Sequence, residues 1–139
     1  MTLRYLLDTN VLSEPSAAAP NPGVVKHFQR HQLHIATASV VWNELLYGSH
    51  RLPASKRRDT LQAYIDEALR PSLTILPYDT AAGEWHAVER ARLEKAGTPR
   101  PFVDGQIAAI ARVNGLILVT ANAKDFRFFD GLVVEDWRS

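Results

Sequence analysis

The chain contains no cysteine, and this absence excludes disulfide bonds, thiolate metal sites and a cysteine nucleophile. It also lacks any apolar run near the roughly 20 residues that a membrane-spanning helix needs. The apolar stretch at the N-terminus is too short for a signal peptide, and Asp8 interrupts it. We therefore expect a soluble cytoplasmic protein without a membrane segment.

A strong net charge is missing as well. The 16 Lys and Arg residues and 15 Asp and Glu residues leave a net charge of +1, which alone does not indicate a nucleic-acid partner. The sequence has no glycine-rich phosphate loop, which argues against a nucleotide-dependent switch. It has no internal repeat either. With 139 residues, of which 46% are apolar, the chain suits a single globular domain over residues 1–139.

Four polar motifs are present, each at the end of an apolar run. They are Leu6-Leu7-Asp8-Thr9-Asn10, Trp42-Asn43-Glu44-Leu45, Phe102-Val103-Asp104-Gly105 and Thr120-Ala121-Asn122-Ala123-Lys124-Asp125-Phe126. Apolar neighbours draw these acids toward the core, where an unpaired charge is unfavourable. Arginines, backbone N–H groups or a hard divalent cation could offset the charges. The last of these interpretations predicts an enzyme.

Apolar spacing, helix caps and turn residues predict alternating strands and helices. Strands are expected at residues 4–7, 34–36, 73–76, 116–119 and 132–134. Helices are expected at residues 22–30, 39–47, 55–68, 79–95 and 103–113, with Gly48 ending the second. This alternation favours a parallel sheet with helices on both faces. Because such sheets bind ligands beyond the carboxyl ends of their strands, Asp8, Asn122 and Asp125 are expected at one edge.

Each of these polar residues also has an ordinary explanation. Glu44 and Asp104 flank the apolar stripes of predicted helices, where a glutamate often forms a surface salt bridge and an acid in the first turn is stabilised by the helix N-terminus. Asp8, Asn122 and Asp125 could simply form turns or cap helices. It is the joint placement of the five residues that favours a metal site.

The order and spacing of the motifs resemble those of PIN-domain ribonucleases of the VapC toxin type, from type II toxin–antitoxin pairs. The resemblance implies an α/β, PIN-like three-layer fold with a central parallel sheet and an acidic pocket at the carboxyl edge of the strands. It also implies Mg²⁺- or Mn²⁺-dependent hydrolysis of RNA, a homodimer, and inhibition by a VapB-like antitoxin. The matching segments lie at residues 6–14, 42–48, 104–109, 119–126 and 134–137.

Carried over by position, the resemblance implies that Asp8, Glu44 and Asp104 form the main acidic triad and hold the metal. Asn122 stands where the family often has an aspartate, so this position brings an amide oxygen and no charge. Asp125, three residues further on, is expected to contribute that charge and to take part in catalysis. The expected reaction is attack of water on a phosphodiester, which needs no nucleophilic side chain.

Supporting roles are expected for polar and basic residues beside these acids. Thr9 and Asn10 directly follow Asp8 and, with Asn122, could hydrogen-bond the acids or the scissile phosphate. Arg100, Lys124 and Arg127 flank the acidic motifs and are expected to contact RNA phosphates.

Two other functions remain open at this stage. The first is a metal-dependent phosphohydrolase of another kind, such as a haloacid-dehalogenase-like phosphatase. That class needs a second acid two residues after the first, and Asn10 stands there. The second is a degenerate PIN domain that binds RNA or protein without cleavage. For the antitoxin, an apolar groove could be formed by Val11, Leu12, Trp42, Leu46 and Tyr47.

Overall fold

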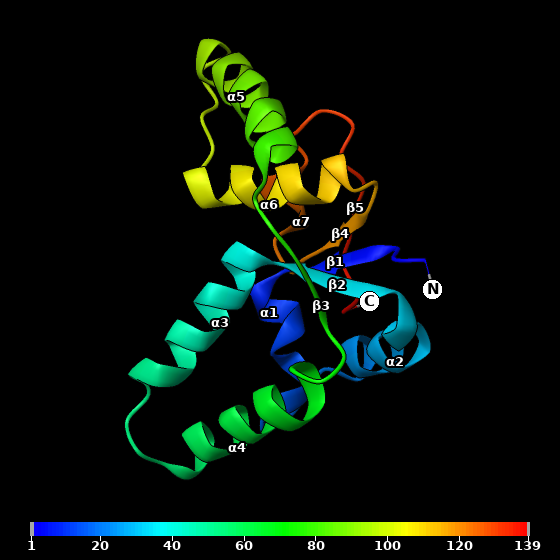
Figure 1. The fold of residues 1–139 in the computed structure, drawn as a ribbon, viewed down its shortest axis with the longest axis vertical. Coiled ribbons are helices and arrows are strands. Elements are labelled where there is room, and N and C mark those ends of the chain that lie inside the picture. The colour runs from blue at the N-terminus through cyan, green and yellow to red at the C-terminus, as the bar shows by residue number, and fades with distance from the viewer. Residues whose placement is uncertain (1, 139) are drawn as a thin grey trace.

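The fold is a five-stranded parallel sheet between helices, described over residues 2–138 by a computed structural model (Figure 1). The strand order is β3-β2-β1-β4-β5, and every neighbouring pair is parallel. This confirms the predicted fold class. In chain order the elements are β1 (Tyr5–Leu7), α1 (Thr9–Leu12), a 3₁₀ turn (Glu14–Ser16), α2 (Pro22–His31), a 3₁₀ turn (Gln32–His34), β2 (Ile35–Ala38), α3 (Ser39–Arg51), α4 (Lys56–Tyr64), a π-helical turn (Ile65–Leu69), β3 (Thr74–Leu76), α5 (Thr80–Lys95), α6 (Phe102–Val113), β4 (Ile117–Val119), α7 (Ala123–Phe126) and β5 (Val134–Glu135).

Helices cover both faces of the sheet. In Figure 1, α2 and α4 lie on one side of the strands, and α5 and α6 lie on the other. Leu6, Leu7, Ala36, Leu118 and Val119 are fully buried, as expected for parallel strands covered on both faces. Within residues 2–138, no helix is both long and apolar enough to cross a membrane.

The position of β1 at the centre of the sheet creates a topological switch point. After β1 the chain adds β2 and β3 on one side, and it later adds β4 and β5 on the other. Asp8 directly follows β1 and Thr120 directly follows β4, so both lie where open parallel sheets bind ligands. The backbone N–H of Asp8 donates to the carbonyl of Val119 at 2.9 Å, which joins the two strand ends.

Three helices begin at the polar caps that the sequence predicts. The side chains of Asn21, Ser55 and Asp79 each accept a hydrogen bond from the backbone N–H three residues further on. Gly97, just beyond α5, has a φ of 77°, a left-handed conformation that glycine adopts without a side-chain clash. Local cap chemistry therefore accounts for these boundaries.

The prediction that Gly48 ends a helix is wrong. Gly48 stays within α3, whose N-cap is Ala38 rather than Ser39 and which continues to Arg51. A glycine ends a helix where it turns left-handed, and the positive φ values in this chain belong to other glycines. The helix instead ends where Leu52 takes an extended conformation before Pro53, because proline disfavours the helical conformation of the preceding residue.

Other helix and strand boundaries differ by a few residues from those predicted from the sequence. β2 begins at Ile35 and extends to Ala38, and β5 covers Val134–Glu135 rather than residues 132–134. The long helix predicted at residues 55–68 becomes α4 followed by the π-helical turn Ile65–Leu69. The short helices α1 and α7 were not predicted, because four residues are too few to show a helical period.

Candidate functional site

Asp8 is the deeply buried acid of the site, with 8% of its surface exposed. Its Oδ1 accepts a hydrogen bond from the Thr9 backbone N–H, and its Oδ2 accepts one from the Thr120 hydroxyl, both at 2.8 Å. Burial raises the pKa of the Asp8 carboxyl, while the hydrogen bonds from Thr120 and Thr9 partly oppose this rise. The surroundings therefore orient the carboxylate but stabilise its charge incompletely.

Thr9 links Asp8 to Glu44. Its backbone N–H binds Asp8, and its hydroxyl donates to Glu44 Oε2 at 3.0 Å. Glu44 is exposed on α3, the helix that follows β2, so the two acids come from neighbouring strand ends. Thr9 therefore contacts both acids, of which Glu44 lies 35 residues away from it in the sequence.

Asp104 lies half-buried in the first turn of α6. Burial raises the pKa of its carboxyl, and the negative charges of Asp8, Asp125 and Glu44 raise it further, whereas Arg100 lowers it. The structure therefore places Asp104 within electrostatic reach of the other three predicted acids.

The donor chemistry of this cluster fits a hard divalent cation. Its ligands would be carboxylate oxygens, which Mg²⁺ and Mn²⁺ prefer. Among residues 2–138, no group of three or more His, Asp or Glu side chains is arranged so that it could hold a metal ion. Mg²⁺ does not require one, because it commonly keeps several waters and uses one or two carboxylates. The raised pKa values of Asp8 and Asp104 indicate negative charge that a cation would offset.

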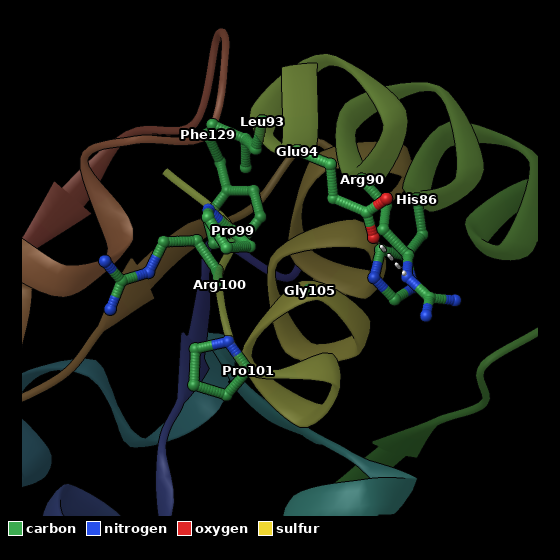
Figure 2. Close-up of a pocket in the computed structure, with 9 residues that line it drawn as sticks. All are labelled: His86, Arg90, Leu93, Glu94, Pro99, Arg100, Pro101, Gly105 and Phe129. Atoms are coloured by element: carbon green, nitrogen blue, oxygen red, sulfur yellow. Dashed lines mark ion pairs between the residues drawn. The ribbon is translucent and has the colours of Figure 1, made fainter. Parts of the chain in front are cut away.

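Arg100 lies beside the acids. Its Nη2 is 4.0 Å from Asp125 Oδ1, and its guanidinium carbon lies 4.7 Å from the centre of the Phe128 ring. Figure 2 shows the side chain pointing away from His86, on the far side of a cavity of about 20 Å³ between α5 and α6. A cavity of that size holds about one water, so it is not the substrate site.

The other predicted RNA contacts lie on the surface. Lys124 and Arg127 are both exposed, the first within α7 and the second directly after it. α7 also carries Asp125 and follows β4 at the switch point. The structure therefore places positive charge on the β4 side of the acidic cluster.

Thr120 is a further residue of the site, and its role was not predicted from the sequence. It is fully buried, donates to Asp8, and accepts a hydrogen bond from the Asn122 backbone N–H at 3.1 Å. Its place directly after a buried strand is the sequence feature that could have indicated this role.

The Asn10 side chain also connects the ends of β1 and β4, because its Oδ1 accepts a hydrogen bond from the Ala121 backbone N–H at 3.4 Å. The Asn122 side chain itself is exposed.

Arg138 supports the same loop from the C-terminal end of the chain. Its Nη2 donates to the carbonyl of Ala121 at 3.0 Å while its guanidinium binds the Asp136 carboxylate, with one contact at 2.6 Å. No local pattern marks this residue, since its loop partner lies 17 residues away. The fold alone brings the two together.

The predicted apolar groove is wrong for two of its residues. Val11 and Leu12 are buried in the core, because they form the inner side of the unpredicted helix α1. Trp42 and Leu46 are half-buried, whereas Tyr47 is 63% exposed.

Comparison with known proteins agrees with this arrangement. Residues 5–132 match the PIN domain family. The chain is 33% identical over 135 residues to the tRNA(fMet)-specific endonuclease VapC of Shigella flexneri, covering 97% of this chain and 98% of that protein. The fold is similar to FitAcB from Neisseria gonorrhoeae (TM-score 0.85, 29% identity, 94% and 95% covered) and to DNA-bound VapBC from Salmonella typhimurium (TM-score 0.83, 30% identity, 97% and 98% covered). This chain belongs to the PIN domain family.

Proposed function

We propose that this PIN domain, comprising residues 1–139, is a metal-dependent endoribonuclease and the toxin of a VapBC-type pair. The observation that carries the proposal is the buried Asp8 carboxylate at the switch point, together with Asp104, whose pKa is raised by burial and by the charges of Asp8, Asp125 and Glu44. Because the Shigella relative is named for tRNA(fMet) cleavage, tRNA is the first substrate to test. The proposed site of action is the cytoplasm.

The resident ion would be Mg²⁺ or Mn²⁺, held by Asp8 and Asp104 directly or through water, with Glu44 as a ligand or as the residue that positions a water. When bound, it would lower the pKa of a water and stabilise negative charge on the phosphoryl oxygens. An ionised carboxylate accepts about four hydrogen bonds, and Thr9 and Thr120 use two of those on Asp8, so both oxygens keep acceptor capacity toward the site. Glu44 uses Oε2 to hold Thr9, and its Oε1 can orient the attacking water.

Positive charge supports the same reaction from the β4 side. Arg100 lies next to Asp104 and Asp125, where a guanidinium can bind oxygens of the scissile phosphate as their charge grows. Lys124 and Arg127 would hold phosphates further along the strand.

The two alternative functions fit the site less well. A phospho-aspartyl mechanism needs an acid two residues after the first, and Asn10 instead uses its amide oxygen to hold the Ala121 loop. A domain that binds RNA or protein without cleavage has no need for Asp8, Glu44 and Asp104, whose mutual repulsion is unfavourable without a cation.

A nuclease of this kind would damage its own cell, so an inhibitory partner is part of the proposal. Similar solved structures are described as FitAB and VapBC complexes, which supports a VapB-like antitoxin and a homodimeric toxin for this chain. Co-expression with the small protein encoded beside it is expected to give a complex that purifies together and no longer cleaves RNA. Failure to bind or inhibit would contradict the toxin–antitoxin assignment.

The direct test is incubation of the purified protein with total RNA and purified tRNA in Mg²⁺ or Mn²⁺, with EDTA as a control. Cleavage ends are mapped by sequencing. Asp104→Asn should abolish the cuts, while Asp59→Asn, which changes an exposed aspartate on α4, should leave them intact. A folded Asp104→Asn variant with full cleavage would contradict the assignment of the site.

A further inference from the structure

A hollow of about 240 Å³ lies between α3 and α6 and adjoins the acidic site at Glu44. Glu44 forms part of its wall, and two further wall residues, Val103 and Gln106, lie one residue before and two residues after Asp104 on α6. Its remaining lining residues are Ser39, Val40 and Asn43. A group bound in this α3–α6 hollow would therefore lie beside Glu44, at the edge of the acidic site.

The chemistry of the wall suits a flat, uncharged, polar-edged group. Val40 and Val103 provide apolar surface, and Val103 is 37% exposed. Asn43 and Gln106 each carry an amide, which both donates and accepts hydrogen bonds. No lysine or arginine is among the lining residues, so the hollow lacks the charge that a phosphate requires.

The order of the β-strands in the sheet determines what a bound RNA would meet on each side of the acids. β2, β1 and β4 lie side by side, and they are followed by α3 with Glu44, by Asp8, and by α7 with Asp125. The α3–α6 hollow is on the β2 side of the acids, whereas Lys124 and Arg127 are on the β4 side. A strand that places one phosphate at the acids would therefore meet positive charge on one side and the hollow on the other.

We propose that the α3–α6 hollow binds one unpaired nucleobase next to the scissile phosphate and that Asn43 and Gln106 determine which base is preferred. The inference rests on the proposed ribonuclease function. Sequence-specific proteins read RNA mainly through unpaired bases, whose edges form hydrogen bonds and whose faces pack against side chains. The volume is below the roughly 300 Å³ at which pockets for whole small molecules begin, which suits a single base.

The test compares base preference around the cut in wild type, Asn43→Ala, Gln106→Ala and the double variant, using a randomised single-stranded RNA pool and sequenced ends. Gln29→Ala, an exposed helical amide on α2, is the matched control. Wild type is expected to prefer one base at a position beside the cut. The double variant should lose about tenfold of that preference, at the low end of what paired base contacts supply, and Gln29→Ala should lose none.

Val103→Phe provides an independent variant, since its larger side chain would fill the hollow. It should slow cleavage of the preferred sequence while leaving the thermal shift produced by Mn²⁺ unchanged. A wild-type enzyme without base preference, or variants with unaltered preference, would overturn the inference alone. Variants that keep the base preference but change the oligomeric state in sedimentation would also overturn the inference, because the hollow would then be a contact between copies of the chain. A wild-type protein that cleaves no RNA would overturn the proposed function as well.

Discussion

Asp104 occupies a position where its own negative charge is unfavourable, because burial and three neighbouring acids raise its pKa. An aspartate whose folded pKa exceeds its unfolded value destabilises the fold at neutral pH. This destabilisation begins to decrease as the pH falls through the folded pKa, and it is absent below the unfolded pKa. The acidic cluster around Asp104 thus lowers the stability of the metal-free protein, and a bound divalent ion would restore it.

Replacing Asp104 by Asn should therefore raise the melting temperature of the metal-free protein at pH 7 by a few degrees, since 1 kcal/mol corresponds to about 2–4 °C in a chain of this size. Wild type should gain further stability with Mn²⁺, about 2.7 kcal/mol at a concentration 100 times the Kd, and the variant should gain much less. Calorimetry with and without Mn²⁺ measures both effects. Asp59→Asn, which also removes an acid from the first turn of a helix, is the control, and a metal-free Asp104→Asn variant that melts no higher than Asp59→Asn would contradict this account.

Thr120 orients Asp8 and lowers its pKa through a hydrogen bond. Thr120→Val should raise the pKa of Asp8 further, so the acid limb of the kcat/KM profile should move to higher pH because the carboxylate must be ionised to act. Losing a hydrogen bond to a buried group should also destabilise the protein by about 1–3 kcal/mol.

Thr37→Val is the matched control for this change. Thr37 is equally buried, but its hydroxyl donates to the carbonyl of Leu7 at 2.8 Å, in the sheet rather than in the acidic cluster. It should lower stability to a similar extent and leave the pH profile in place. Equal pH profiles for the two variants would show that Thr120 has only a structural role.

At the scale of elements, the packing of α5 on α6 depends on Gly105, the residue after Asp104. A Cβ at this position would overlap the His86 imidazole on α5, whereas a Cβ at Gly48 on α3 would meet no atom within 4 Å. The close contact holds the first turn of α6, and with it Asp104, against α5. The contrast between the two glycines makes this contact testable.

Gly105→Ala is expected to destabilise the protein by about 1–3 kcal/mol through overpacking. Gly48→Ala should stabilise it by roughly 0.5–1 kcal/mol, because alanine loses less conformational freedom in a helix. Urea denaturation followed by circular dichroism measures both changes. If both substitutions gave the same sign, the packing of α5 against α6 would be looser than the structure indicates.

At the scale of the whole molecule, the net charge is only +1, but the positive and negative charges are unevenly distributed. The acids gather at the switch point, while Arg100, Lys124 and Arg127 lie on its β4 side. Affinity for RNA should therefore fall steeply with salt despite the near-neutral total charge.

In the uncleaving Asp104→Asn background, Lys124→Gln and Arg127→Gln should each reduce the slope of log affinity against log salt by about 0.7, the value for one contact to a single-strand phosphate. Lys26→Gln, which removes an exposed charge on α2, should leave the slope unchanged. Fluorescence anisotropy over a salt series gives these slopes. Equal slopes for all variants would show that Lys124 and Arg127 do not contact RNA phosphates.

The sequence by itself determined the features that depend on neighbours within a few residues. Caps such as Asn21 and Asp79, the apolar run before Thr120, and the acids at strand ends are local signals, and they were sufficient for the α/β class and for the PIN resemblance. The short helices α1 and α7 were not predicted because four residues show no helical period, and the end of α3 was placed too early because Gly48 was given more weight than Pro53.

Only the tertiary structure decided how the acids are held. Asp8 and Thr120 are 112 residues apart, and Thr9 meets Glu44 across 35 residues, so no local pattern could reveal either contact. Arg138 reaches the Ala121 loop for the same reason. The physical cause is that hydrogen bonds and pKa shifts depend on distance in space, which the parallel sheet sets by bringing the ends of β1, β2 and β4 to one edge.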